Sequence, residues 1–230
     1  MMAVSRWSSG TRIKICGIRD VETALFAMDA GADAVGLVFY PPSPRAVEIQ
    51  SARQIVRALP HGAVSVALFV NPTVAQVRDV LLEVSPTVLQ FHGDESAAFC
   101  AQFGHPYWKA IRVSAATDLL ELQEHFRGAD RLLLDADARS NHATIDADAK
   151  LYGGTGELFD WKLIPSILAN SIVLSGGLTA DNVADAIRLV RPWAVDVSSG
   201  VEEPRGMKSR ALIQNFINAV KKEDSLEQAV

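Results

Sequence analysis

The sequence predicts a single (β/α)8 barrel, a closed ring of parallel strands surrounded by helices. Short β-branched, apolar segments alternate with amphipathic helical segments from one end of the chain to the other. No stretch of linker-like composition separates them, and strands that alternate with helices pair in parallel through right-handed crossovers. An open, doubly wound sheet is the alternative architecture, but the chain lacks the G-x-G-x-x-G turn that is typical of it.

The strand segments are recognised by apolar residues at alternate positions and the helical segments by their longer period. We expect strands at 12–16, 34–39, 64–70, 87–91, 107–112, 130–135, 171–175 and 194–198. We expect helices at 20–30, 48–59, 73–84, 95–103, 117–126, 160–169, 180–190 and 208–221. Asp20 can cap the first helix and Gly31 can end it. The barrel is placed at residues 11–222, between an N-terminal tail at 1–10 and a C-terminal tail at 223–230.

Composition narrows the class of protein. The chain has 230 residues and a net charge of -5, which argues against a nucleic-acid surface. No apolar run approaches the roughly 20 residues that cross a bilayer, and residues 1–10 do not resemble a signal peptide. We therefore expect a cytoplasmic protein without nucleic-acid or membrane partners. Its two cysteines, Cys16 and Cys100, fit neither a disulfide framework nor a zinc site.

The first strand carries an unusual polar face. Alternation places Lys14 and Cys16 on one face and two isoleucines on the other. If the apolar face meets the helices, Lys14, Cys16, Asp135 and Asp196 all point into the barrel. The first and last strands are neighbours in a closed barrel, so Lys14 and Asp196 could pair there, in either a structural or a catalytic role.

Several strands end in chemically useful residues. Cys16 ends the first strand, His92 follows the fourth and Asp135 ends the sixth. After Asp135 the chain continues for about 25 residues without a convincing element, which is longer than most loops in compact domains. Because active sites of these barrels lie at the carboxyl ends of the strands, we expect this segment to be a lid over the site.

Two glycine-containing turns follow the last two strands. Glycine allows backbone N–H groups to approach an anion closely, and this pair of loops often binds phosphate in such barrels. The residues expected to contact a phosphate are Gly176, Gly177, Ser198, Ser199 and Gly200.

Eight motifs occur in one order along the chain. They are Lys-Ile-Cys-Gly at 14–17, Ser-Pro-Arg at 43–45, Phe-Val-Asn at 69–71, Gln-Phe-His-Gly-Asp-Glu at 90–95, Leu-Leu-Leu-Asp at 132–135, Gly-Gly-Thr-Gly with Phe-Asp-Trp at 153–161, Ser-Gly-Gly-Leu at 175–178 and Val-Asp-Val-Ser-Ser-Gly-Val-Glu at 195–202. With these motifs the sequence closely resembles the phosphoribosylanthranilate isomerase family of tryptophan biosynthesis. The resemblance covers everything but the two tails and implies a (β/α)8 fold.

The resemblance also implies an Amadori rearrangement of N-(5-phosphoribosyl)anthranilate to 1-(2-carboxyphenylamino)-1-deoxyribulose 5-phosphate. Cys16 would be the general base at ribose C2 and Asp135 the general acid at the ring oxygen. Arg45 would hold the anthranilate carboxylate, and Gly154 would contact the substrate from the long loop. Acid–base chemistry of this kind needs no metal and no organic cofactor.

Some roles stay open at this point. His92 could stack near the aromatic ring or hydrogen-bond a loop, and Asp196 is expected to orient or pair with another group. A cysteine that ends a strand is commonly a packing residue, and Arg45 could be an ordinary solvated charge. At neutral pH, Cys16 and Asp135 would both ordinarily be in the wrong protonation state. Desolvation and the substrate phosphate would raise the pKa of Asp135, but the same negative charge would also raise that of Cys16, so a nearby cation such as Lys14 must compensate at the thiol. Glu157 departs from the family pattern by adding negative charge to the long loop.

Two other functions remain as alternatives. A related barrel, indole-glycerol-phosphate synthase, closes a ring with loss of carbon dioxide and would need a catalytic Lys–Glu set, which Lys14 or Lys109 alone does not make. A sugar-phosphate binding module without activity would not need both Cys16 and Asp135. A monomer and a homodimer are equally compatible with the sequence.

Overall fold

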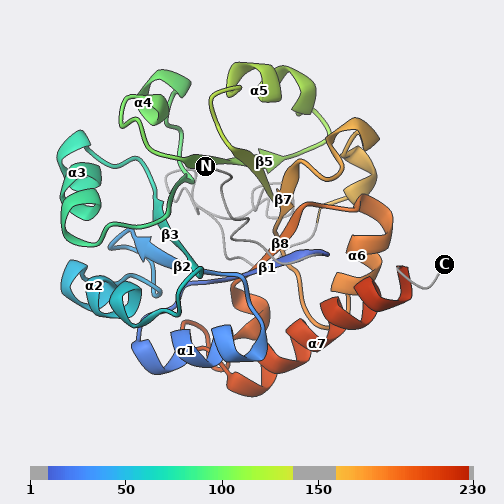
Figure 1. Cartoon of the computed structure of the whole chain (residues 1–230). Helices are drawn as coiled ribbons and strands as arrows, with labels where there is room; N and C mark the ends of the chain where they lie inside the picture. The colour runs from blue at the N-terminus through green and yellow to red at the C-terminus, as the bar shows by residue number, and fades with distance from the viewer. Residues whose placement is uncertain (1–9, 137–158, 228–230) are drawn as a thin grey trace, which may run out of the picture.

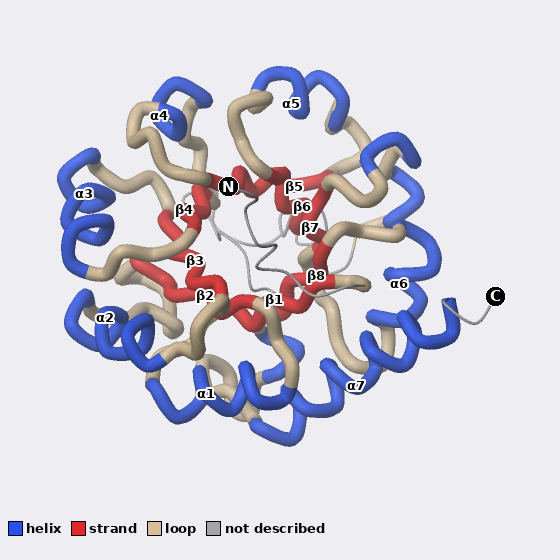
Figure 2. Tube along the Cα trace, in the orientation of Figure 1, coloured by secondary structure: helices blue, strands red, loops and turns tan. Residues whose placement is uncertain are grey.

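A computed structural model describes residues 10–136 and 159–227, and these form a closed barrel of eight parallel strands in the order β1 to β8. Figure 1 shows the helices arranged around this ring, and Figure 2 shows the strands, in red, inside the ring of helices. The strands are β1 (Arg12–Cys16), β2 (Ala34–Phe39), β3 (Val64–Phe69), β4 (Val88–Phe91), β5 (Tyr107–Val113), β6 (Arg131–Ala136), β7 (Ile172–Leu174) and β8 (Ala194–Val197). The barrel prediction is confirmed, and the open sheet is excluded.

The helices of the described residues lie outside the strands. They are α1 (Val21–Ala30), α2 (Ile49–Ala58), α3 (Val74–Glu83), α4 (Ala97–Ala101), α5 (Leu119–His125), α6 (Val183–Val190) and α7 (Arg210–Glu227). The predicted caps of α1 are confirmed, since the Asp20 side chain accepts a hydrogen bond from the Thr23 N–H and Gly31 has a left-handed φ of 111°. None of these helices is long and apolar enough to span a membrane.

The helix predicted at 160–169 is wrong. Two short 3-10 helices, Trp161–Leu163 and Ser166–Leu168, occupy this segment instead. Pro165 lies between them, and a proline disfavours helical geometry at the residue before it and supplies no N–H for a helical hydrogen bond. Ile164 accordingly has extended backbone angles, with φ at −83° and ψ at 115°.

The final helix continues beyond the expected end of the barrel. The boundary predicted between residues 222 and 223 falls inside α7, which extends to Glu227. Asp224 accepts hydrogen bonds from the backbone N–H of Thr11, at 2.9 Å, and from its hydroxyl, at 2.7 Å. These contacts tie α7 to the residue just before β1, so this part of the predicted tail belongs to the folded structure.

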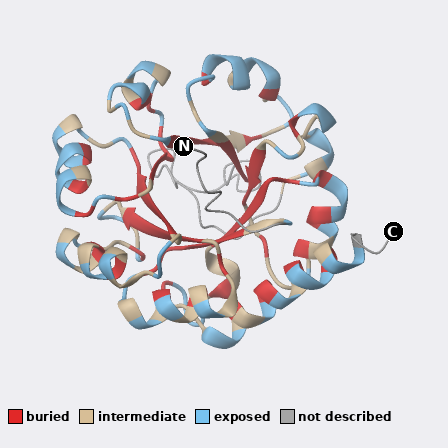
Figure 3. Ribbon diagram, viewed as in Figure 1, coloured by how far each residue is buried: buried red, intermediate tan, exposed pale blue. Residues whose placement is uncertain are grey.

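The apolar residues form two layers, and Figure 3 shows most of the strand ribbon coloured as buried. The layer between the strands and the helices contains Ile13 and Ile15 of β1. A separate cluster contains Trp108, Leu133 and Ala194, whose strand positions alternate with those of the outer layer. The inward orientation predicted for alternate residues is therefore confirmed, and it directs the polar strand-end residues into the barrel.

Candidate active site

A pocket opens at the carboxyl ends of the strands and contains most of the predicted site residues. Its polar lining consists of Cys16, Tyr40, Ser43, Arg45, His92, Asp135, Ser175, Asp196 and Ser198. Gly176, Gly177, Ser199 and Gly200 do not line this pocket but belong to the two turns beside it. Gly154, the predicted substrate contact, and most of the predicted lid lie outside the described residues.

Cys16 is the last residue of β1 and is 5% exposed. A Cβ atom at Gly36, on the neighbouring strand β2, would lie 2.8 Å from its Sγ and 3.1 Å from Lys14 Cε. Gly36 therefore provides the space that both side chains fill. Burial raises the pKa of the Cys16 thiol, and the nearby charges of Lys14 and Lys208 only partly oppose this rise.

Lys14 and Asp196 form the ion pair that strand adjacency suggested. Lys14 Nζ donates to Asp196 Oδ1 at 2.7 Å, and both side chains are buried. Ser175 donates to the other oxygen of Asp196 at 3.3 Å. Burial disfavours the charge on Lys14, but Asp196 and Cys16 outweigh this effect, so the pKa of Lys14 is raised. A permanent cation therefore lies beneath the thiol.

Arg45 has a partner that the sequence did not reveal. Its Nε donates to Glu202 Oε1 at 2.7 Å and its Nη2 donates to Glu202 Oε2 at 2.8 Å. Glu202 also accepts from Lys208 Nζ at 2.7 Å and from the Gly206 N–H at 2.9 Å. Although burial opposes ionisation, these partners lower the pKa of Glu202 to about 2. The prediction that Arg45 is near the site holds, but the arginine is buried and ion-paired, so it is not an ordinary solvated charge.

Lys208 was also missed by sequence reasoning. Its Nζ donates to the backbone carbonyl of Ser198 at 2.9 Å, and the Ser198 hydroxyl in turn donates to the Cys16 carbonyl at 3.2 Å. Burial lowers the pKa of Lys208, and Glu202 only partly restores it. The residue stands just before α7, far from the thiol in sequence, and only folding brings the two together.

Asp135 lies on β6 and faces the same pocket as Cys16. Its Oδ1 accepts a hydrogen bond from the Ala136 N–H at 2.9 Å, and its Oδ2 is 3.0 Å from His92 Nε2. Of the two open roles for His92, the structure shows a hydrogen bond, and its partner is the predicted acid instead of a loop. The carboxyl is thereby held in one orientation.

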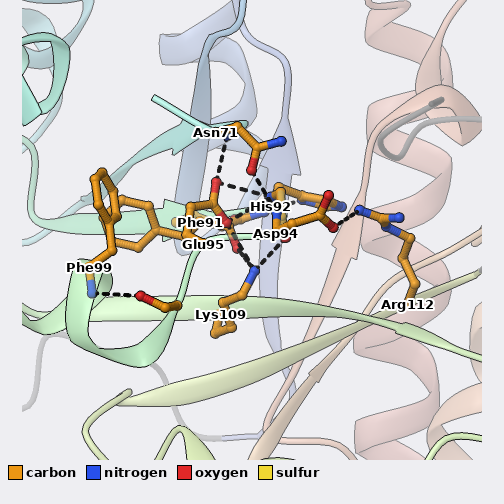
Figure 4. Close-up of polar contacts among 11 residues, drawn as sticks. Asn71, Phe91, His92, Asp94, Glu95, Phe99, Lys109 and Arg112 are labelled. Carbon is orange, nitrogen blue, oxygen red and sulfur yellow. Dashed lines mark hydrogen bonds and ion pairs between the residues drawn. The ribbon is translucent and has the colours of Figure 1, made fainter. Parts of the chain in front are cut away.

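The loop that carries His92 is anchored by a buried cluster shown in Figure 4. Lys109 Nζ donates to the Gly93 carbonyl at 2.7 Å and to Glu95 Oε2 at 3.0 Å. Glu95 also accepts from the backbone N–H groups of Asn71, at 2.7 Å, and Gly93. Neither Lys109 nor Glu95 lines the pocket of Cys16. This Lys–Glu pair therefore supports the loop and is not the catalytic set that a lyase would need.

The two glycine turns pack against the site and against each other. Gly176 has φ at 85°, and a Cβ there would lie 3.0 Å from Asp135 Oδ1 and 2.6 Å from the Ala136 N. A Cβ at Gly200 would lie 1.9 Å from the Leu178 carbonyl oxygen. Close approach of the turns thus requires glycine at both positions.

Comparison with known proteins decides the family. The model of the family described as N-(5'-phosphoribosyl)anthranilate (PRA) isomerase matches residues 13–219. The chain belongs to the PRA isomerase family. It is 50% identical over 214 residues to the PRA isomerase of Dechloromonas aromatica, covering 93% of this chain and 98% of that protein. It is 48% identical over 213 residues to that of Pseudomonas fluorescens, covering 93% of this chain and 100% of that protein.

Solved structures of the PRA isomerase family agree with this assignment. The enzyme from Thermotoga maritima superposes with a TM-score of 0.79 at 40% identity, over 92% of this chain and 99% of that one. A complex of phosphoribosyl anthranilate isomerase with reduced 1-(o-carboxyphenylamino)-1-deoxyribulose 5-phosphate superposes with a TM-score of 0.75 at 36% identity, over 92% of this chain and 99% of that one. The family resemblance inferred from the motifs is therefore confirmed.

Proposed function

We propose that this chain catalyses the Amadori rearrangement of N-(5-phosphoribosyl)anthranilate, with Asp135 as the general acid and Cys16 as the general base. The observation that carries the residue assignment is that both side chains reach one pocket from separate strands, β6 and β1. Acid and base acting on different atoms of one sugar need this separation. Membership of the PRA isomerase family supports the reaction and the substrate.

Ring opening is the task of Asp135. The protonated carboxyl delivers a proton to the ring oxygen while the bond from that oxygen to C1 breaks, leaving a hydroxyl and an iminium at C1. The Ala136 N–H and His92 hold the carboxyl in place, so that little reorientation is needed at this step.

Proton removal from C2 is the task of Cys16. The thiolate takes the proton, the electron pair of the C–H bond forms the C1–C2 double bond, and the double-bond electrons of the iminium return to nitrogen, which gives an enolamine. Protonation of C1 and loss of the proton of the C2 hydroxyl then give the ketone. A thiol with a raised pKa is a strong base once it is ionised, but little of it is ionised at neutral pH. Lys14 and Lys208 supply positive charge that favours the thiolate.

The two ends of the substrate carry negative charge. Nη1 of Arg45 is the terminal guanidinium nitrogen that Glu202 does not engage, and we assign it to the anthranilate carboxylate. Backbone N–H groups of the turns at 175–177 and 198–200 suit the phosphate. Gly176 also borders Asp135, so the phosphate and the acid are held by one turn.

We place the enzyme in the cytoplasm, as a small-molecule enzyme of tryptophan biosynthesis with neither nucleic-acid nor membrane partners. The enzyme of Thermotoga maritima is described as dimeric, and monomers have been generated from it. Both states are therefore candidates for this chain. Size-exclusion chromatography with light scattering distinguishes them.

The activity is tested with purified protein and freshly made substrate. We expect loss of the fluorescence of the anthranilate adduct and appearance of the carboxyphenylamino-deoxyribulose phosphate by mass spectrometry. The aminoketose 5-phosphate is supplied as a second substrate, because an indole ring can close only onto its C2 carbonyl. Formation of indole-glycerol phosphate from it, with release of carbon dioxide, would show a lyase instead. Saturable binding of the substrate without turnover would show a binding module and overturn the proposal.

A further inference from the structure

Gln90 is a buried polar residue that the mechanism above does not use. It lies on β4, is 0% exposed and shares a strand face with Val88, which belongs to the apolar cluster inside the barrel. Burying an amide among apolar side chains costs free energy unless the amide is hydrogen-bonded. Its Nε2 lies 2.9 Å from Nδ1 of His92, and its Oε1 has no partner within the described residues. The hydrogen bond found for this side chain within the described residues therefore joins it to His92.

The contact continues to the proposed acid. His92 Nε2 lies 3.0 Å from Asp135 Oδ2, so Gln90, His92 and Asp135 form one buried chain of hydrogen bonds. In this amide orientation the Gln90 nitrogen can only donate, so Nδ1 of His92 accepts and carries no proton. The single proton of the neutral ring is then on Nε2 and is donated to Asp135.

This arrangement has a consequence for the charge of His92. Protonation of Nδ1 would place two N–H groups face to face, and the amide therefore disfavours the imidazolium form. An imidazolium beside Asp135 would hold the carboxyl as an anion that has no proton to give. A neutral ring instead orients the carboxyl and leaves it free to be protonated.

We propose that Gln90 is a positioning residue that keeps His92 neutral and in the Nε2–H tautomer, so that Asp135 can act as a proton donor. The assignment of Asp135 as the acid rests on the proposed function, whereas the tautomer of His92 does not. Other titratable or charged groups face His92 and Asp135 from β1, the loop after β2, β5 and β8. They are unchanged in the variants below. They are Lys14, Cys16, Tyr40, Arg45, Arg112 and Asp196.

The tautomer is tested directly by nitrogen-15 NMR of histidine-labelled protein, with the His92 signals assigned by their loss in His92→Gln. In the parent at neutral pH we expect Nδ1 to resonate as an unprotonated nitrogen and Nε2 as a protonated one. In Gln90→Glu a carboxylate faces Nδ1, and we expect both nitrogens to be protonated. A parent ring protonated on Nδ1, or an unchanged ring in Gln90→Glu, would overturn the proposal.

Kinetics test the consequence for Asp135. We expect Gln90→Glu to lower kcat by at least about tenfold, within the range of general acid catalysis, while KM changes by less than about threefold. The pH profile of kcat should also change in shape. Gln123→Glu, the same change on the exposed side of α5 (Leu119–His125), should match the parent in both respects.

Gln90→Met is a second variant, which keeps the test decisive if Gln90→Glu fails to fold. Methionine has a similar volume to glutamine and no charge. It removes the donor, so we expect His92 to populate both tautomers and kcat to fall. A folded Gln90→Met protein with the parent tautomer, kcat and pH profile would reduce Gln90 to a packing residue. If the parent itself proved inactive, the proposed function would fail, but the NMR result would still decide the tautomer.

Discussion

Arg45 and Glu202 are joined by two hydrogen bonds, of 2.7 and 2.8 Å, although 157 residues separate them in the sequence. Both side chains are almost completely buried, at 7% and 2% exposure. A buried carboxylate that already holds the guanidinium determines which of its nitrogens remains for a substrate. The same carboxylate positions Lys208 near the thiol. Glu202 thus organises two of the cations at the site, and this makes its removal informative.

Glu202→Gln should destabilise the protein in a pH-dependent way. Because the pKa of Glu202 falls to about 2 on folding, its stabilising contribution is complete above its ordinary value in the unfolded chain and is lost as pH falls towards 2. Breaking a buried ion pair costs about 3 kcal/mol, so we expect a loss of that order at pH 7. Urea unfolding of parent and variant should show this difference shrinking below about pH 4. Glu203→Gln, at the exposed neighbouring residue, should have little effect, and a pH-independent difference would contradict the assignment.

Arg45→Ala should abolish the preference for a ligand that carries the ring carboxylate over the same ligand without it. The parent should bind a reduced product analogue more tightly than the same molecule without its carboxylate, by about 1.5–3 kcal/mol for a charged hydrogen bond. In Arg45→Ala the two affinities, measured by calorimetry, should converge. Loss of the contact with Glu202 affects both ligands equally. Comparing the two ligands on one folded variant therefore isolates recognition of the carboxylate. A preference that persists unchanged would place the carboxylate elsewhere.

Cys16→Ser and Asp135→Asn should each lower kcat by at least about a hundredfold, because each removes a proton-transfer group. Binding of the reduced product analogue should stay close to that of the parent. Cys100→Ala serves as the control for loss of a thiol, since Cys100 is buried in α4 outside the pocket. Near-parent turnover in either variant would remove that residue from the mechanism.

Lys14→Met should move the ionisation of Cys16 to higher pH. Burial raises the pKa of this thiol and the Lys14 charge lowers it, so loss of that charge leaves burial less opposed. The pH at which the rate of iodoacetamide modification begins to increase should therefore be higher in Lys14→Met than in the parent. Cys16→Ala should not be modified, since burial raises the pKa of Cys100 to about 12. Lys222→Met removes an exposed charge and should behave as the parent; an unshifted profile in Lys14→Met would refute the coupling.

Much of the architecture could be read from local patterns. Alternation within each strand predicted which side chains point inward, and barrel closure predicted that β1 and β8 would place Lys14 beside Asp196. Motif order was enough to identify the family. These inferences succeed because the two-residue period of a strand and the neighbours in a closed parallel ring follow from backbone geometry. The helix predicted at 160–169 does not form because Pro165 interrupts it, and this effect is equally local.

The partners of the site residues required the tertiary structure. Nothing near Arg45 in the sequence indicates Glu202, and nothing near Cys16 indicates Lys208 or the space at Gly36. These contacts join residues that are distant along the chain, and they depend on how side chains pack in three dimensions. Local periodicity predicts the direction of a side chain, whereas its partner, burial and protonation are set by whatever the completed fold places around it.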